Sequence, residues 1–161
     1  MRAVILSDSH GDDSGLRYVL EQVWKQSGPV DAYFHLGDGA RDFERAEGFI
    51  RGHDPRAQVI CVKGNCDFGD PDTPLVVETR LGGANVLLTH GHAFHVKQTL
   101  AYLDDAARDR GCTIALYGHT HVPNFEMRSA LLLNPGSVQD YRAALLDVDD
   151  QGRAKPRLVS F

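Results

Sequence analysis

The sequence predicts an α/β domain that finishes in β-strands, with two sheets packed against each other and helices on the outside. Two observations carry this prediction. Strand-like apolar runs alternate with amphipathic stretches through the first two-thirds of the chain, and two-residue periodicity follows. The length of 161 residues suits one domain with a single core. No repeat, low-complexity tract or linker interrupts the sequence, so residues 1–161 are expected to form one compact domain.

Five short apolar runs predict strands. Each run has three or four residues, and a polar segment follows nearly every one. The runs cover residues 4–6, 33–36, 59–62, 86–88 and 114–117.

Three amphipathic stretches predict helices. In the first, apolar residues from Leu16 to Trp24 recur at helical spacing, Ser14 is a suitable N-cap, and residues 27–29 end the helix. The other two predicted helices span residues 43–50, ending near Gly52, and residues 96–110, stopped by Gly111.

Two hairpins are predicted by alternating segments around turn residues. Residues 75–79 and 85–89 flank Gly82-Gly83, and residues 143–148 and 156–159 flank the turn at 149–152.

Side chains of the metal-ligating kind follow the predicted strands. Strands that end together at one edge of a sheet would deliver these side chains to one place. Carboxylates, imidazoles and an amide, with no required thiolate, suit divalent metals held through oxygen and nitrogen. The segments are Asp8-Ser9-His10, Gly37-Asp38, Gly64-Asn65-Cys66-Asp67, His90-Gly91-His92 and Gly118-His119-Thr120-His121.

Local geometry explains how these residues could share ions. Residues two apart in extended chain point the same way, so Asp8 and His10 can hold one ion together. Asp38 follows a glycine, and its two carboxylate oxygens could bridge two metals. Asn65 offers a neutral oxygen, so two divalent ions would keep about two positive charges and attract an anionic substrate.

Composition limits the classes of partner and compartment. The net charge of −5 argues against an extended nucleic-acid footprint, although metal ions can reverse the sign locally for a small phosphate ester. No apolar run approaches the ~20 residues that a bilayer span needs, and no signal peptide precedes the first strand. The three cysteines are unpatterned, which does not indicate a disulfide framework. We therefore expect a cytoplasmic protein with no membrane association.

The ordered segments resemble the calcineurin-like metallophosphoesterase superfamily, and specifically its small bacterial and archaeal phosphodiesterase branch. The resemblance covers essentially the whole chain and implies a two-sheet α/β/β/α sandwich. It also implies two divalent ions, with manganese as the first choice and iron, cobalt, nickel or zinc compatible. By the family pattern, one ion is held by Asp8, His10, Asp38 and His121, and the other by Asp38, Asn65, His90 and His119.

The implied activity is hydrolysis of a small phosphodiester by a metal-bridging hydroxide. Many relatives have histidine where this chain has Cys66, and a thiol is a poor substitute for imidazole as a proton donor. Leaving-group protonation is then assigned to another group, either His92 or water. Two roles are open for His92: approaching substrate, or hydrogen bonding that orients His90. We therefore count Asn65, His92, Cys66 and Asp38 as candidate catalytic residues.

Two other functions remain as alternatives. A phosphomonoesterase could use the same site, and a catalytically weak binding scaffold would resemble the small subunit of the retromer coat. A phospho-receiver domain fits Asp8 but not the histidines and is set aside. Relatives of this kind often form dimers or larger assemblies, so a homo-oligomer is compatible with the sequence.

Overall fold

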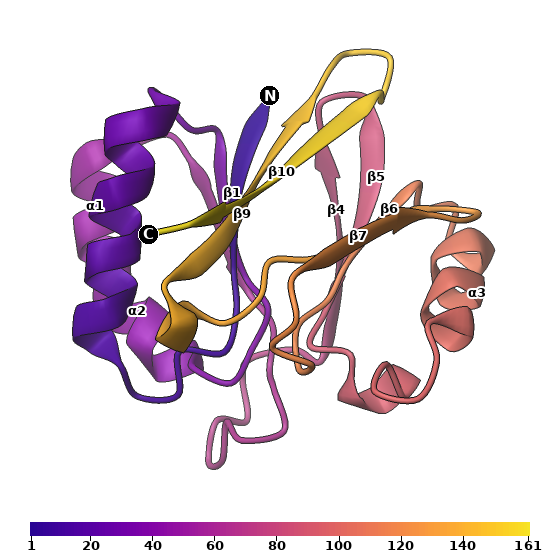
Figure 1. Cartoon of the computed structure of the whole chain (residues 1–161), viewed down its shortest axis with the longest axis horizontal. Helices are drawn as coiled ribbons and strands as arrows, with labels where there is room; N and C mark the ends of the chain where they lie inside the picture. The colour runs from indigo at the N-terminus through magenta and orange to yellow at the C-terminus, as the bar shows by residue number, and fades with distance from the viewer.

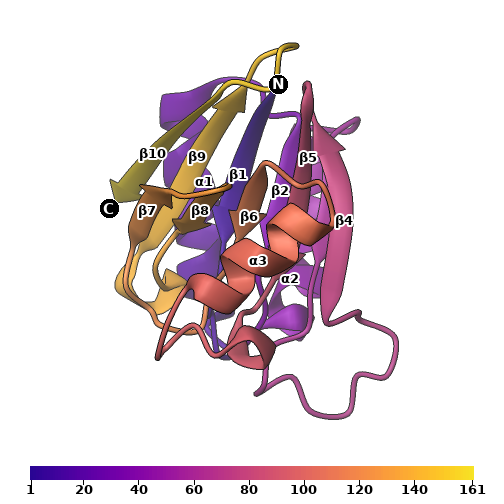
Figure 2. The ribbon, with the colours of Figure 1, turned by 90° about the vertical axis from the view of Figure 1, so that its right-hand side faces the viewer.

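The computed structural model describes residues 1–161 and contains two five-stranded sheets that lie face to face (Figures 1 and 2). The predicted α/β/β/α sandwich is confirmed. The first sheet has the spatial order β10 (Ala154–Ser160), β9 (Arg142–Val148), β1 (Arg2–Leu6), β2 (Ala32–His35) and β3 (Gln58–Cys61). The second has the order β4 (Val76–Leu81), β5 (Ala84–Thr89), β6 (Ile114–Leu116), β8 (Leu131–Asn134) and β7 (Asn124–Met127).

Helices cover the outer face of each sheet. Helices α1 (Asp13–Ser27) and α2 (Ala40–His53) lie on the first sheet, and α3 (Ala101–Asp109) lies on the second (Figure 1). Successive side chains of a strand point to opposite faces. In β1, Ile5 therefore packs between the sheets, whereas Val4 and Leu6 pack against the helices. Burial on both faces explains why this strand is a continuous apolar run.

The parallel strands place their carboxyl ends at one edge of the sandwich. Strands β1, β2 and β3 are parallel in the first sheet, and β5, β6 and β8 are parallel in the second. The segments that follow these strands therefore meet at the lower end of the molecule as drawn in Figure 1. None of the α-helices has the length and apolarity required of a bilayer span.

Two predicted helix starts are wrong. The N-cap of α1 is Asp12, whose Oδ1 accepts a hydrogen bond of 2.8 Å from the Gly15 N–H, so the cap is not Ser14. The third helix begins at Ala101 rather than at residue 96. A short 3₁₀ helix, His92–Phe94, comes first, and His95 then adopts φ +53°, which no α-helix can continue through.

Both predicted hairpins are present, as β4–β5 and β9–β10. Two strands were not predicted. Strand β8 is a short, fully buried run in the interior of the second sheet, and β7 pairs with it at the sheet edge.

Candidate metal centre

The seven predicted ligands meet at the edge where the parallel strands end. Their exposure is graded. Asp8, Asp38 and His90 are buried, His119 and His121 are half-buried, and His10 and Asn65 are exposed. The first sheet supplies Asp8, His10, Asp38 and Asn65, and the second supplies His90, His119 and His121.

Three of these residues form a first group of donor atoms. His121 Nε2 lies 3.1 Å from Asp8 Oδ1 and 3.2 Å from His10 Nε2. His10 Nε2 lies 3.7 Å from Asp8 Oδ1. All three atoms lie close enough to one another to hold a metal ion together.

A second group surrounds His90. Its Nε2 atom lies 3.3 Å from Asp38 Oδ2, 3.0 Å from Asn65 Oδ1 and 3.2 Å from His119 Nδ1. The Nδ1 atom of His90 donates a hydrogen bond of 2.7 Å to the Leu36 carbonyl. That bond leaves Nε2 as the atom with a free lone pair.

One oxygen of Asp38 faces both groups. Asp38 Oδ2 lies 3.3 Å from His90 Nε2 and 3.8 Å from His10 Nε2. The other oxygen, Oδ1, accepts a hydrogen bond of 2.7 Å from the Cys66 N–H. Oδ2 therefore lies near both groups, and a bridging role for the Asp38 carboxylate stays a prediction.

The donor set fits a divalent cation. Asp8 Oδ1 is buried and accepts no hydrogen bond from the protein, which is costly for a charged oxygen. The Nε2 atoms of three histidines, from both sheets, lie 3.1 to 4.0 Å from this oxygen, and none forms a hydrogen bond with it. Oxygen and imidazole ligands in two adjacent clusters suit divalent transition metals, so the residues present match the group that the sequence implies.

The protonation states of His119 and Asp38 favour metal binding, whereas the proton that nearby carboxylates favour on His90 would have to leave first. Burial, together with the neighbouring His90, lowers the pKa of His119 to about 4, so its imidazole is neutral near pH 7. Burial acts to raise the pKa of Asp38, but hydrogen bonds from His90 and Cys66 outweigh it and hold that pKa below its usual range. For His90, burial lowers the pKa and the carboxylates of Asp38 and Asp8 raise it by more.

Most of the predicted ligands have an unusual backbone. Positive φ values, between +47° and +67°, occur at Asp8, His10, Asp38, His119 and His121. Non-glycine residues rarely adopt this conformation, and such strain concentrates at functional sites. The tight turns also exclude side chains nearby: a Cβ on Gly64 would lie 2.1 Å from Asp38 Oδ1.

The family model of the calcineurin-like phosphoesterase superfamily domain matches residues 1–151 of the chain. The chain belongs to this family. It is 33% identical over 141 residues to the probable metallophosphoesterase YsnB of Bacillus subtilis, covering 86% of this chain and 76% of YsnB. It is 31% identical over 155 residues to the phosphodiesterase YfcE of Escherichia coli, covering 86% of this chain and 79% of YfcE.

Solved structures from other organisms share this fold. A predicted phosphoesterase from Streptococcus pneumoniae superposes with a TM-score of 0.76 at 32% identity, covering 99% of this chain and 88% of that one. A Vps29 variant from Entamoeba histolytica has a TM-score of 0.76 at 20% identity, covering 100% of this chain and 99% of that one. The second likeness shows the fold alone.

Asp67 anchors the ligand segments of this phosphoesterase. Its carboxylate accepts hydrogen bonds from four backbone N–H groups, at 2.8 to 3.0 Å. This one side chain ties the turn after β3 to the turn after β2 and caps α2. The amides belong to Asp38, Gly39, Ala40 and Gly64.

Asp42 is a positioning residue that the sequence analysis missed. It is buried in the first turn of α2 and accepts hydrogen bonds from Ser9 Oγ at 2.5 Å and the Gly11 N–H at 2.8 Å, on either side of His10. Arg45 compensates its charge at 2.8 Å. The only sequence signal for this role is an Asp four positions after the Gly-Asp pair. That signal is weak, because acidic residues are common in the first turn of any helix, where they interact favourably with the helix dipole.

The segment after β8 supports the site from behind. Ser137 Oγ donates a hydrogen bond of 2.8 Å to the Asp8 carbonyl, and Asn134 Nδ2 donates one of 2.9 Å to the Gly118 carbonyl. The first bond joins the segment after β8 to the first sheet, and the second joins β8 to the segment after β6 within the second sheet.

His92 and Cys66 lie beside the second and first groups, respectively. The His92 ring is centred 5.4 Å from that of His90, and its Nδ1 is buried without a partner. Because Leu36 holds His90, the alternative in which His92 orients His90 is wrong. Cys66 is exposed, and its Sγ lies within ligand distance of His10 and Asp38. Desolvation and the charge of Asp38 raise the pKa of the thiol, so it stays protonated.

Proposed function

We propose that this phosphoesterase is a phosphodiesterase that uses two divalent ions, with manganese as the first choice. The observation that carries the proposal is the pair of donor groups on either side of Asp38 Oδ2. Asp8, His10, Asp38 and His121 would hold one ion. Asp38, Asn65, His90 and His119 would hold the other.

The reaction is the addition of water to phosphorus with cleavage of one P–O ester bond. When bound, the two ions supply a nucleophile at neutral pH and neutralise charge on the phosphoryl oxygens. The protein positions them through buried Asp8 and Asp38 and leaves the opposite side open at exposed His10 and Asn65. The departing oxygen takes a proton from His92 or from water, because Cys66 is a weak acid.

A diester is favoured over a monoester by charge. Asp8 and Asp38 are the only carboxylates among the predicted ligands, so two divalent ions leave about two positive charges. Counting the hydroxide nucleophile as well would leave about one positive charge, which matches the single negative charge of a diester rather than the double charge of a monoester. YfcE, named a phosphodiesterase, is 31% identical to this chain, which supports the same choice.

The test is hydrolysis of bis(p-nitrophenyl) phosphate by metal-stripped protein, with and without added manganese, beside p-nitrophenyl phosphate. Manganese-dependent turnover that favours the diester is expected. Preference for the monoester would replace the proposal with a phosphomonoesterase.

Asp38→Asn separates an enzyme from a binding scaffold such as Vps29. Loss of the shared charge should reduce manganese-dependent turnover by at least about a hundredfold. The variant should remain folded, as judged by circular dichroism. A protein that binds two ions yet hydrolyses no diester with any divalent metal would point to the scaffold.

A further inference from the structure

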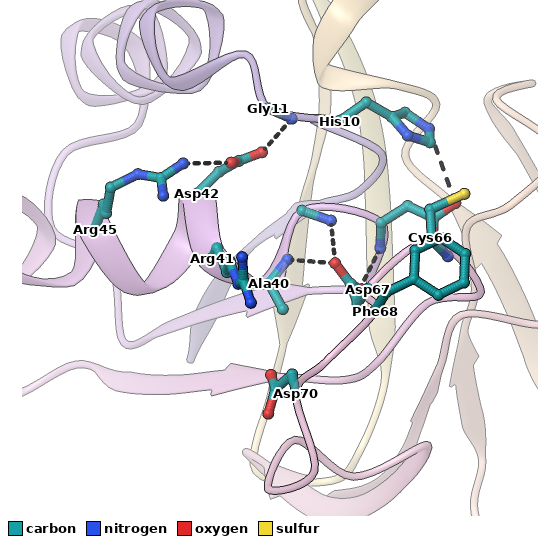
Figure 3. A pocket seen from close by; sticks show the side chains of 12 residues that line it. His10, Gly11, Ala40, Arg41, Asp42, Arg45, Cys66, Asp67, Phe68 and Asp70 are labelled. Atoms are coloured by element: carbon teal, nitrogen blue, oxygen red, sulfur yellow. Dashed lines mark hydrogen bonds and ion pairs between the residues drawn. The ribbon is translucent and has the colours of Figure 1, made fainter.

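A cavity of about 540 Å³ extends from the metal centre along the start of α2. The predicted site residues His10, Asp38 and Cys66 line this cavity. Arg41, Phe68 and Asp70 line it as well (Figure 3). Cavities of this size hold ligands of nucleotide dimensions. The proposed reaction at Asp38 does not by itself require this space.

The carboxylates of this cavity already accept hydrogen bonds from the protein. Asp42, Asp67 and Asp70 each accept hydrogen bonds from backbone amides, as well as from side chains at Asp42 and Asp70. Arg45 is also occupied, because it pairs with Asp13 at 2.9 Å and Asp42 at 2.8 Å.

Arg41 is a positively charged residue of the cavity that has no partner in the protein. It is exposed in the first turn of α2 and forms no ion pair or side-chain hydrogen bond with the protein. A Cβ on Gly69 would lie 3.6 Å from Arg41 Nη2, so the guanidinium reaches the segment that carries Phe68. A free guanidinium at this position suits a phosphate oxygen.

Phe68 places an aromatic ring at the cavity wall. Its side chain is 80% exposed, the highest value among the large apolar residues of the protein. Its backbone N–H donates a hydrogen bond of 3.0 Å to the Cys66 carbonyl, which fixes its position relative to the metal centre. An exposed ring and a free arginine in the same cavity are suited to binding a base and a neighbouring phosphate.

We propose that the site takes a nucleotide phosphodiester that carries a second phosphate, as in a dinucleotide or the end of a short single strand. The proposal rests on the phosphodiesterase function above. The base stacks on Phe68 and the second phosphate binds Arg41, while the scissile diester lies at Asp38. A cyclic nucleotide, with its single phosphate, leaves Arg41 without a partner.

Three chromogenic diesters test the proposal by stepwise addition. They are methyl p-nitrophenyl phosphate, the p-nitrophenyl ester of thymidine 5′-phosphate, and the same ester with a 3′-phosphate. The thymidine should raise kcat/KM by roughly tenfold through stacking. The added phosphate should raise it by a further threefold to tenfold, roughly.

Paired variants assign each gain to one residue. Phe68→Leu should remove the thymidine gain and Phe68→Tyr should keep it, because the ring rather than apolar area is required. Arg41→Ala should remove only the 3′-phosphate gain, and Arg41→Lys should restore part of it. Tyr102→Ala and Arg157→Ala, at exposed positions outside the cavity, are matched controls and should leave both gains unchanged.

Calorimetric binding of thymidine 3′,5′-bisphosphate, beside inorganic phosphate, gives a readout that needs no turnover. Tighter binding of the bisphosphate that depends on Phe68 and Arg41 supports the nucleotide site even if no diester is hydrolysed. Equal kcat/KM for the three diesters, with binding insensitive to both variants, overturns the nucleotide proposal. Turnover of the methyl diester would then still support the phosphodiesterase.

Discussion

At the scale of single residues, the predicted ligands combine two demands that few residue types meet. Each needs a donor atom for a cation, and five of them also need a positive φ. Asp and Asn tolerate that conformation better than other non-glycine residues, and His is also enriched in it. Substitution of these residues by alanine therefore removes the donor and keeps the backbone strain.

Cys66→His tests whether the thiol limits the rate. An imidazole at this exposed position, beside His10 and Asp38, could protonate a departing alkoxide. We expect kcat to rise about tenfold or more for a dialkyl phosphate and to change little for bis(p-nitrophenyl) phosphate, whose leaving group needs no proton. Steady-state rates on the two substrates measure this difference. An equal effect on both would show that Cys66 does not limit leaving-group protonation.

The sequence predicted the candidate ligands from their residue types, but it did not predict the groups whose role depends on hydrogen bonds made in the fold. Asp8, His10 and His119 can be recognised as candidate ligands by their residue type and spacing. Asp42 and the Leu36 carbonyl cannot, because their roles depend on which backbone groups the fold brings to them. For the same reason, the sequence does not predict the hydrogen bond that Asp38 Oδ1 accepts from the backbone N–H of Cys66.

At the scale of elements, the turn after β3 and the start of α2 act as one unit because of Asp67. Helix α2 has no capping side chain at its own N-cap, Gly39, so the carboxylate of a distant turn takes that role. The predicted ligands Asp38 and Asn65 are thus held in register by a residue that binds no ion.

Asp67→Asn should loosen that unit. An amide group in place of the carboxylate turns an N–H donor toward backbone donors, which should lower the free energy of unfolding by roughly 3 kcal/mol. Manganese affinity should fall with it. Urea unfolding and calorimetric titration measure the two effects, with Asp72→Asn, an exposed carboxylate in the same loop that accepts no hydrogen bond, as the control. Unchanged values for Asp67→Asn would show that the four amides do not need the charge.

Element boundaries show where periodicity fails as a guide. Val96 packs on the second sheet with the apolar residues of α3, so it looked like part of that helix. A turn that ends at residue 98 and irregular backbone at residues 99–100 separate Val96 from the helix. Strand β8 was not predicted because it has only four residues. Its last residue, Asn134, is followed by Pro135-Gly136, a sequence typical of a turn.

At the scale of the whole molecule, the metal centre joins the two sheets. Each proposed ion has ligands from both sheets, so binding should stabilise the folded state alone. Manganese at a hundredfold excess over its Kd should add about 2.7 kcal/mol for each ion bound, raising the Tm by roughly 5–10 °C per ion. Calorimetry of metal-stripped and reloaded protein checks this, and the increase should be largely lost in Asp38→Asn. An equal increase in that variant would place the ions elsewhere.

His35 links stability to pH. It is buried in β2, and burial lowers its pKa to about 4 from 6.5. The unfolded chain therefore binds a proton that the folded chain does not, and stability falls as pH falls from 6.5 towards 4 by roughly 3 kcal/mol. His35→Asn should flatten the slope across that window in urea unfolding of metal-stripped protein. Identical slopes would show that His35 titrates alike in both states.

The pairing of β9 with β1 sets an order of events during synthesis. All seven predicted ligands have been synthesised once residue 121 is added, yet β9, one of the two neighbours of β1, has not. Ser137, which fixes the Asp8 carbonyl, is also made later. A nascent chain can thus carry every ligand and still have no place for an ion. We therefore expect metal loading to follow the synthesis of β9 and Ser137.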